Sequence, residues 1–221
     1  MLRRVRSIAA GLIAGIALVL MIVMVPAKGR AELIDRVVAA VNNDVITFSE
    51  LRQTIAFNAA LGGNKGDERR IEAETLQGII NRRLLLQEAY RLKVAEVSDQ
   101  DVAAEVDRLR QRLGTEAAFR DLLARTDLTE PQLARILGER LLVERFIEKK
   151  IGLFARVNRD EAQSYYKDHA VEFKDSRFAE VQKQIMAYLS AQKVNQQLDQ
   201  YIEELRSRAV IRTNEVREEG Q

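Results

Sequence analysis

The amino-acid sequence predicts a mainly α-helical protein, in which a helical bundle core is completed by a small β-sheet. Residues 34–46 hold two short runs of β-branched side chains around a polar turn, which is typical of a hairpin. Between Thr47 and Arg208 the apolar residues recur at helical spacing, and residues 209–213 then alternate as a strand does. We therefore expect the N-terminal hairpin and the C-terminal strand to form one sheet.

The turn of the predicted hairpin is Asn42-Asn43. Asparagine is one of the few residues besides glycine that tolerates the positive φ of a tight hairpin turn. Thr47 follows the second strand and is expected to cap a helix, with Glu50 reaching back to the Thr47 N–H in a capping box. The chain should pass from hairpin to helix with almost no loop.

Glycines and capping residues indicate where the helices between Thr47 and Arg208 begin and end. Gly62-Gly63 ends the first helix, and a long helix with a broad apolar face is expected over residues 68–92. Three later helices begin with a capping residue followed three positions later by an acid or amide: Ser98 with Asp101, Thr129 with Gln132, and Asn158 with Glu161. Thr115 is expected to open a short helix through Ala124. Pro131 fits the first turn of its helix, where no N–H is needed.

The C-terminal part is expected to return to the N-terminal hairpin. Residues 176–208 can form one long helix, and residues 209–213 follow as a strand. An isolated strand leaves its backbone groups unpaired, so this strand should join the hairpin and bring the two ends of residues 32–213 together. Residues 214–221 are charged and lack apolar anchors, and we expect them to be a disordered tail.

The first 31 residues have the pattern of a secretory signal. Arg3, Arg4 and Arg6 precede an apolar run over residues 8–25, and Gly29 and Ala31 place small residues at the −3 and −1 positions of a cleavage site. Cleavage is expected between Ala31 and Glu32, with Ala27 as a second site. The alternative is an uncleaved anchor, because eighteen apolar residues nearly span a bilayer. Either way the rest of the chain lies outside the cytoplasm, in the periplasm or anchored at the inner membrane.

Composition excludes several function classes. Without the five cationic residues before Glu32, 30 basic residues remain against 33 acidic ones, so the exported part carries a net charge of −3. Nucleic-acid binding needs a concentrated basic surface, and we expect none. Cysteine is absent, which excludes thiol catalysis and cysteine metal sites. No phosphate-binding loop or histidine pair is present, so we expect no cofactor and no metal.

Two groups of polar residues have the composition of possible chemical sites. His169, the only histidine, adjoins Asp168, and we interpret it as a solvated loop residue and not as half of a catalytic dyad. A cationic cluster on one helix (Arg135, Arg140, Arg145, Lys149 and Lys150) is interleaved with Glu139, Glu144 and Glu148, which indicates surface ion pairs and not an anion site. The sequence thus predicts no enzyme.

The order of several motifs resembles the SurA-type periplasmic chaperones. These motifs are Ile34–Leu51 (IDRVVAAVNNDVITFSEL), Leu76–Gln87 (LQGIINRRLLLQ), Val97–Val102, Leu128–Leu133, Asn158–Glu161 with Tyr165-Tyr166 and Glu172-Phe173, and Leu205–Ile211. The resemblance implies a helical core that holds unfolded outer-membrane proteins. In the family, the segment around Glu172-Phe173 leads into a parvulin-type prolyl isomerase domain. Here Ser176 passes directly into the last helix, so the isomerase is missing.

The resemblance and the predicted export together imply an ATP-independent periplasmic holdase for unfolded, outer-membrane clients. The client would occupy a groove lined by apolar side chains and ringed by charge, with Phe48, Phe57 and Tyr188 as candidate contacts. Membrane contact is expected only through an uncleaved N-terminal segment, and a homodimer is compatible with this interpretation. The alternative is a membrane-anchored scaffold that docks partners on the helix from Ser176. A third possible function is prolyl isomerisation, which the family name alone would suggest.

Overall fold

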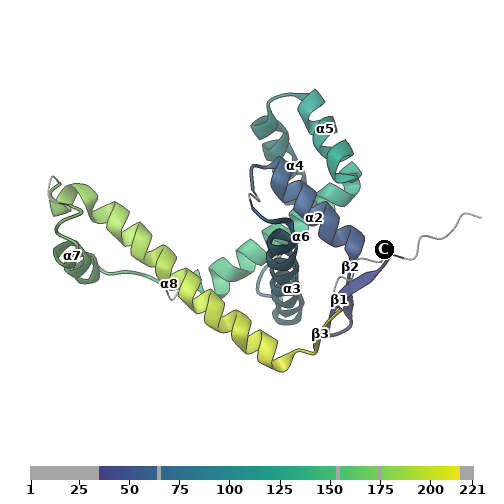
Figure 1. Cartoon of the computed structure of the whole chain (residues 1–221). Coiled ribbons are helices and arrows are strands. Elements are labelled where there is room, and N and C mark those ends of the chain that lie inside the picture. Colours follow the sequence, from purple (N-terminus) through teal and green to yellow (C-terminus); the bar gives the residue numbers. More distant parts are fainter. Residues whose placement is uncertain (1–34, 64–65, 153–154, 174–175, 215–221) are drawn as a thin grey trace, which may run out of the picture. The chain divides into compact units, whose positions relative to one another are not determined.

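The computed structural model describes residues 35–63, 66–152, 155–173 and 176–214. They form seven helices and three strands (Figure 1). In chain order these elements are β1 (Val37–Val41), β2 (Asp44–Thr47), α2 (Phe48–Ala60), α3 (Glu68–Leu92), α4 (Asp99–Leu113), α5 (Glu116–Thr126), α6 (Glu130–Lys150), α7 (Arg159–Asp168), α8 (Phe178–Arg208) and β3 (Ile211–Thr213). The predicted fold class, mainly helical with one small sheet, is confirmed.

The sheet joins the hairpin to the C-terminal strand in the order β2-β1-β3, with both pairs antiparallel. Val41 lies opposite Asp44 on one side and Ile211 on the other. Asn42 has the positive φ expected of the turn, +55°. Its backbone N–H donates to the Val210 carbonyl at 2.8 Å, and its side-chain Oδ1 accepts from the Val210 N–H at 2.9 Å. The predicted meeting of the hairpin and the C-terminal strand is confirmed.

Asn214, expected to begin a disordered tail, is instead bonded to β1. Its backbone N–H donates to the Val38 carbonyl at 2.9 Å, and its side-chain amide donates to the Val37 carbonyl at 3.1 Å. The asparagine continues the β1–β3 pairing because β1 still presents acceptors beyond Thr213. The predicted cleavage site at Ala31 and Glu32 and the rest of the tail, residues 215–221, lie outside the described residues.

Entry into α2 follows the prediction only in part. The Thr47 hydroxyl accepts from the Glu50 N–H at 3.2 Å, as a cap should. The Glu50 carboxylate, however, accepts from the Arg83 guanidinium of α3 at 2.8 Å instead of returning to Thr47. A charge-assisted bond to arginine is stronger than one to a neutral backbone N–H, so the tertiary partner replaces the local one.

The other caps define their helices as expected, with one exception. Complete capping boxes are present at Ser98–Asp101 and Thr129–Gln132. Asn158 accepts from the Glu161 N–H at 2.8 Å, but the Glu161 carboxylate pairs with Lys193 of α8 at 2.6 Å. The long helix over residues 68–92 is confirmed as α3, and the helix after Thr115 is α5, which ends two residues later than expected.

Two apolar clusters hold these elements together. The first joins the sheet, the start of α2, α3, the C-terminal part of α6 and the C-terminal half of α8; its largest fully buried members are Phe146, Ile46, Leu51, Ile80, Val38 and Val41. The second joins the end of α2 to α4, α5 and the N-terminal part of α6, around Phe57, Phe119 and Leu133. Helices α2 and α6 contribute to both clusters and so connect them.

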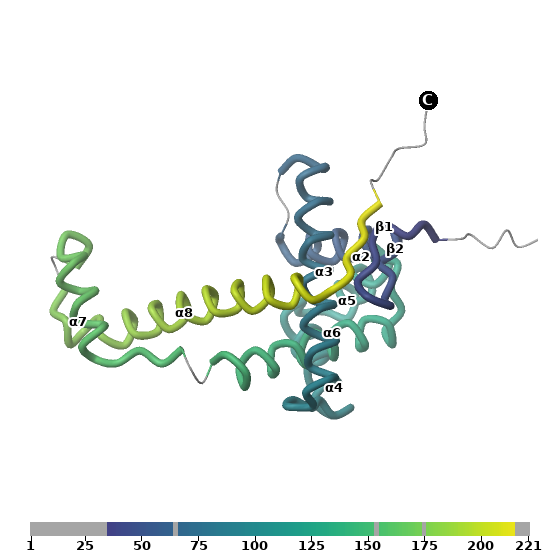
Figure 2. The backbone as a smooth tube through the Cα atoms, turned by 90° about the horizontal axis from the view of Figure 1, so that it is seen from below, coloured from purple at the N-terminus to yellow at the C-terminus, as the bar shows by residue number. Residues whose placement is uncertain are grey.

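The long helix α8 makes different contacts in its two halves. Its C-terminal half packs on α3, where Tyr201 donates to Glu88 at 2.8 Å and Arg206 donates to Asn81 at 2.6 Å. Its N-terminal half packs against α7, which lies beside it in both views (Figures 1 and 2). The predicted helix from Ser176 is therefore confirmed, beginning at Phe178. None of the described helices is long and apolar enough to cross a lipid bilayer.

Candidate functional site

A groove with a volume of about 1030 Å³ lies between the end of α3, the segment that follows it, α4 and α6. We call it the small-residue groove. Its apolar lining consists of Ala89, Tyr90, Ala95, Val97, Val102, Ala103, Val106, Ala134, Gly138 and Leu142. This volume is at the upper end of the range of ~300–1,000 Å³ typical of ligand pockets. The space is sufficient for several side chains of an extended segment.

The groove is hollow because small side chains line two facing helices. Ala103 lies on α4, while Ala134 and Gly138 lie on α6. A Cβ on Gly138 would come within 3.1 Å of Val102 Cγ2, so the glycine permits a close approach of α4 and α6. Ala89 and Val106 are buried beneath the opening. Their apolar atoms form part of the floor of the groove.

Charged side chains surround this apolar floor. Arg110 donates to Glu130 at 2.6 Å and to Asp107 at 3.4 Å. Hydrogen bonding to Glu130 raises the pKa of Arg110 above its ordinary value, so this cation is charged at every physiological pH. Arg135 pairs with Glu139 at 3.4 Å. The lining also contains Lys93, Glu96 and Asp99, so acidic groups outnumber basic ones at the rim.

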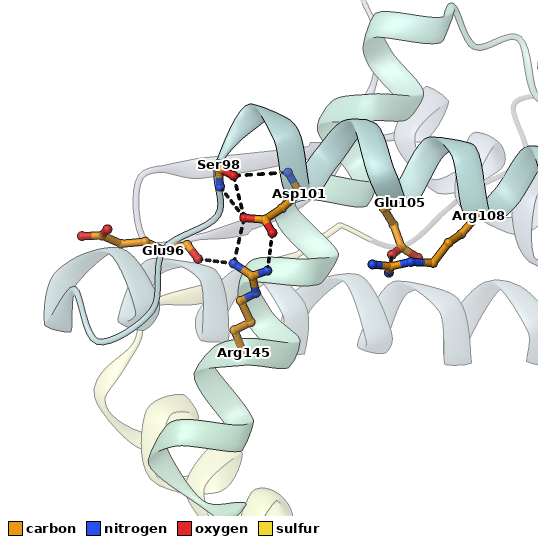
Figure 3. Close-up of polar contacts among 6 residues, drawn as sticks. All are labelled: Glu96, Ser98, Asp101, Glu105, Arg108 and Arg145. Carbon is orange, nitrogen blue, oxygen red and sulfur yellow. Dashed lines mark hydrogen bonds and ion pairs between the residues drawn. The ribbon is translucent and has the colours of Figure 1, made fainter.

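An ion pair between helices fixes one end of the groove (Figure 3). The Arg145 guanidinium of α6 donates to both carboxylate oxygens of Asp101, at 2.7 and 3.0 Å, and to the Glu96 carbonyl at 2.7 Å. Asp101 also accepts from Ser98, whose hydroxyl caps α4. These bonds, that from Arg145 first, hold the pKa of Asp101 well below its ordinary value. The loop carrying Glu96 is thus attached to both helices.

This pair corrects one expectation from the sequence. The sequence predicts surface pairs between Arg145 and glutamates of its own helix, of the kind that Arg135 and Arg140 form. It reaches α4 instead, because the Asp101 carboxylate offers two oxygens to the guanidinium fork. One turn further along α4, Glu105 and Arg108 pair with each other and leave the Asp101–Arg145 contact separate (Figure 3).

The three aromatic residues expected to contact clients do not line this groove. Phe48 lines a separate hollow and lies beneath the Arg36 guanidinium, 4.6 Å from its ring centroid. Phe57 is only 7% exposed and belongs to the second apolar cluster. Tyr188 is 48% exposed on α8, where its ring lies 5.6 Å from that of Tyr165. Of the three, Tyr188 is the most exposed, whereas Phe57 lines the cavity between α2, α3 and α6.

His169 is more enclosed than its sequence context suggested. It follows α7, its ring is half-buried and stacks on Tyr165 with centroids 3.9 Å apart, and its Nδ1 lies 2.9 Å from the Tyr165 carbonyl. A histidine so placed packs on the last turn of α7, and Tyr165 in turn contacts Tyr188 of α8. Within the described residues, no group of histidine and acidic side chains is arranged to hold a metal ion.

Sequence reasoning missed the small-residue groove because its residues are inconspicuous. Alanine in a helix usually indicates a good helix former or a neutral surface position. The available signal was Gly138, a residue that costs about 1 kcal/mol relative to alanine inside a helix. A glycine retained in the middle of α6 indicates that another backbone or side chain comes close, as Val102 does here.

Comparisons with known proteins agree with this architecture. The family model described as the SurA-like N-terminal domain matches residues 1–147. Chaperone SurA of Bordetella pertussis and of Bordetella bronchiseptica are each 27% identical over 142 residues, which is 62% of this chain and 27% of the relative. The chain thus matches about a quarter of these relatives' length. A solved chain of the Campylobacter jejuni pair PEB4 and Cj1289, described as structurally related SurA-like chaperones, shares the fold with a TM-score of 0.54 at 12% identity, covering 82% of this chain and all of that one. The chain therefore belongs to the SurA-like N-terminal domain family.

Proposed function

We propose that this protein is a periplasmic chaperone that holds unfolded polypeptides without ATP. The observation that carries the proposal is the small-residue groove, an open apolar hollow with a charged rim, in a chain of the SurA-like N-terminal domain family. The relatives that the chain matches are named chaperones, and the predicted signal indicates export. We infer that the clients include outer-membrane proteins, which cross this compartment unfolded.

The mechanism follows from the lining. Apolar client side chains would enter the hollow above Ala89 and Val106, and each Å² of apolar surface buried contributes about 25 cal/mol. Much of this gain is offset by ordering the client segment, so binding is weak and reversible. Release requires no nucleotide because the client leaves when it finds a more favourable fold.

The proposal includes no catalytic step. The last long helix, α8, begins two residues after Ser176, at the position where the resemblance would place the isomerase domain. Tyr188 remains in the proposal as a second client contact, since its ring is exposed on α8. Its replacement by alanine tests whether the α7–α8 region contributes to holding.

The decisive experiment compares two neighbouring alanines of α4. Ala103 and Ala104 are both exposed, but only Ala103 lines the small-residue groove. Protein purified from the envelope of expressing cells is added to an outer-membrane barrel protein diluted from urea, and aggregation is followed by light scattering. Wild type and Ala104→Phe are expected to suppress aggregation at near-stoichiometric ratios. Ala103→Phe fills the hollow and should lose most of this effect while unfolding at the same temperature.

A folded wild-type sample that leaves aggregation unchanged would contradict the holdase proposal and favour the anchored scaffold. N-terminal sequencing of the purified protein separates the two locations. A chain that begins at Glu32 is a free periplasmic protein, whereas an intact N-terminus that stays with the membrane fraction is an anchor. Equal suppression by both alanine variants would mean that clients bind elsewhere on the molecule.

A further inference from the structure

A second cavity, of about 680 Å³, lies between α2, α3 and α6 on the other side of the Arg135–Glu139 pair. Arg135 and Glu139 line both this cavity and the small-residue groove, so the two hollows adjoin along one edge of α6. We call the second hollow the arginine cavity, because four guanidiniums line it. They belong to Arg82, Arg83, Arg135 and Arg140.

Three of these arginines are paired with a carboxylate. Arg83 lies 2.8 Å from Glu50, Arg135 lies 3.4 Å from Glu139, and Arg140 lies 3.1 Å from Glu144. Arg82 differs from them. Among the described residues, none accepts a hydrogen bond from Arg82 or forms an ion pair with it.

The position of Arg82 makes this lack of a partner chemically significant. A guanidinium carries five N–H donors in a planar fork and has no acceptor of its own. Arg82 is half-buried, and burial lowers its pKa despite the opposing influence of Glu50 and Glu139. The Asn58 side-chain amide of α2 lines the same cavity and makes no hydrogen bond with a described residue. Among the described residues, the cavity therefore presents a cation and an amide whose hydrogen-bonding capacity is unused.

The charges of the cavity favour a monoanion as the missing partner. Its four arginines are balanced by Asp35, Glu50, Glu139 and Glu144, so the lining has no net formal charge. A carboxylate can pair with the Arg82 fork in two parallel hydrogen bonds. A doubly charged phosphate would meet the field of four nearby carboxylates, which opposes its entry. A polypeptide in the adjoining groove brings carboxylates of this kind to the edge of the cavity.

We propose that Arg82 binds a carboxylate of the client polypeptide, either its C-terminal carboxylate or an Asp or Glu side chain. This inference rests on the proposed holdase function and adds a polar anchor to the apolar groove. The segment beside the carboxylate lies in the small-residue groove, and the chain crosses α6 at Arg135 and Glu139. Glu139 repels the incoming carboxylate and so limits its affinity.

Three labelled, acetylated hexapeptides of alternating alanine and leucine test the proposal, with binding measured by fluorescence anisotropy on the full chain. The first has a free C-terminal carboxylate, the second is amidated, and the third is amidated but has one internal glutamate. The carboxylate peptides are expected to bind about tenfold more tightly than the neutral one, as charge-assisted bidentate pairing allows. A preference for the first over the third would assign the site to the chain terminus, and the reverse to acidic side chains.

Variants then locate the effect. Arg82→Gln should abolish the preference for a carboxylate, and Arg82→Lys should retain part of it without the bidentate fork. Glu139→Gln should tighten binding of the carboxylate peptides because it removes a like charge. Arg70→Gln is the matched control, since Arg70 is an exposed arginine of the same helix that pairs with Glu74. Melting curves of each variant confirm that it is folded.

Equal binding of all three peptides to wild type would overturn the proposal, and so would a carboxylate preference that survives in Arg82→Gln. Absence of binding by every peptide would overturn it too. The aggregation assay separates this failure from that of the proposed function. If wild type still suppresses aggregation through Ala103, the holdase stands and Arg82 is simply solvated; if suppression also fails, both inferences fall.

Discussion

The Tyr201 hydroxyl of α8 donates a 2.8 Å hydrogen bond to the Glu88 carboxylate of α3, joining residues 113 positions apart in the sequence. Glu88 is only 7% exposed, and Arg91 supplies two more hydrogen bonds to it. The pKa of Glu88 is lowered, first by Arg91 and further by Tyr201. This contact attaches the C-terminal half of α8 to the helix at the centre of the first apolar cluster.

Replacing Tyr201 by phenylalanine should lower the free energy of unfolding by about 1.5 kcal/mol, because a buried carboxylate loses one of its donors. Urea denaturation at pH 7 measures the change. Tyr90→Phe is the control, since Tyr90 is exposed on α3 and should leave stability unaltered within a few tenths of a kcal/mol. Equal midpoints for Tyr201→Phe and wild type would show that water replaces the hydroxyl at no cost.

The same tyrosine predicts a loss of stability at alkaline pH. Burial, together with the hydrogen bond to Glu88, raises the pKa of Tyr201 to about 12. The folded pKa of Tyr201 exceeds the unfolded value of about 10. The protonated hydroxyl therefore contributes its full stabilisation of the fold below pH ~10, and this stabilisation is lost as the pH rises toward 12. Wild type should therefore lose more stability than Tyr201→Phe between these values in urea denaturation series. Parallel curves for the two proteins would contradict the assignment.

Asn42 is expected to be the most sensitive position of the sheet. It combines a φ of +55°, two hydrogen bonds with Val210, and a 2.7 Å bond from its amide to Gln87 of α3. Asn42→Ala should cost about 2 kcal/mol, from lost side-chain bonds and a strained backbone, whereas Asn42→Gly relieves the strain and should cost about half as much. Urea denaturation gives both values, and exchange of the Val210 amide, whose N–H donates to Asn42 Oδ1, should quicken in parallel. Exposed Asn43→Ala serves as the control, and equal costs at both asparagines would refute the assignment.

The Asp101–Arg145 pair should make stability depend on acid pH. Hydrogen bonding from Arg145 lowers the pKa of Asp101, so its contribution is complete above the ordinary aspartate value of about 4 and disappears as the pH falls below it. Asp101→Asn should therefore be less stable than wild type at pH 7, and the difference should shrink below pH ~4. Denaturation midpoints across this range provide the measurement. Arg145→Lys, which keeps the charge without the fork, should also be less stable; a gap that stays constant with pH would exclude the pair as its source.

Two helical glycines provide a test of the close approach between α4 and α6. A Cβ on Gly78 of α3 would meet nothing within 4 Å, so Gly78→Ala should stabilise the protein by about 1 kcal/mol through helix propensity. The same change at Gly138 gains this propensity but crowds Val102, and the net gain should be smaller or absent. Thermal denaturation of the two variants compares them directly. Equal stabilisation would mean that α4 and α6 separate without cost and that Gly138 does not set their spacing.

The sequence by itself determined those features of the protein that depend on residues close to one another in the chain. The Asn42 turn, the caps at Ser98, Thr129 and Asn158, and the bounds of α3 follow from backbone geometry and side chains within four positions of one another. The return of β3 to β1 could also be predicted, because a lone strand requires a partner and the hairpin was the only one proposed. The resemblance of the sequence to SurA-type chaperones is carried by these same local motifs.

Tertiary structure alone decided which long side chains meet and where space remains. Glu50, Glu161 and Arg145 each had a plausible partner nearby in sequence, yet they form ion pairs with Arg83, Lys193 and Asp101 on other helices. For Glu50 the charge-assisted bond replaces the local one, whereas Glu161 also keeps a local bond from the Asn158 side-chain amide at 3.3 Å. Both cavities lie between helices, where the side chains that fail to fill them come from separate segments. Periodicity marks an apolar face but not the gap between two such faces. For this reason the groove, and an Arg82 with no ion-pair partner among the described residues, emerged only from the folded chain.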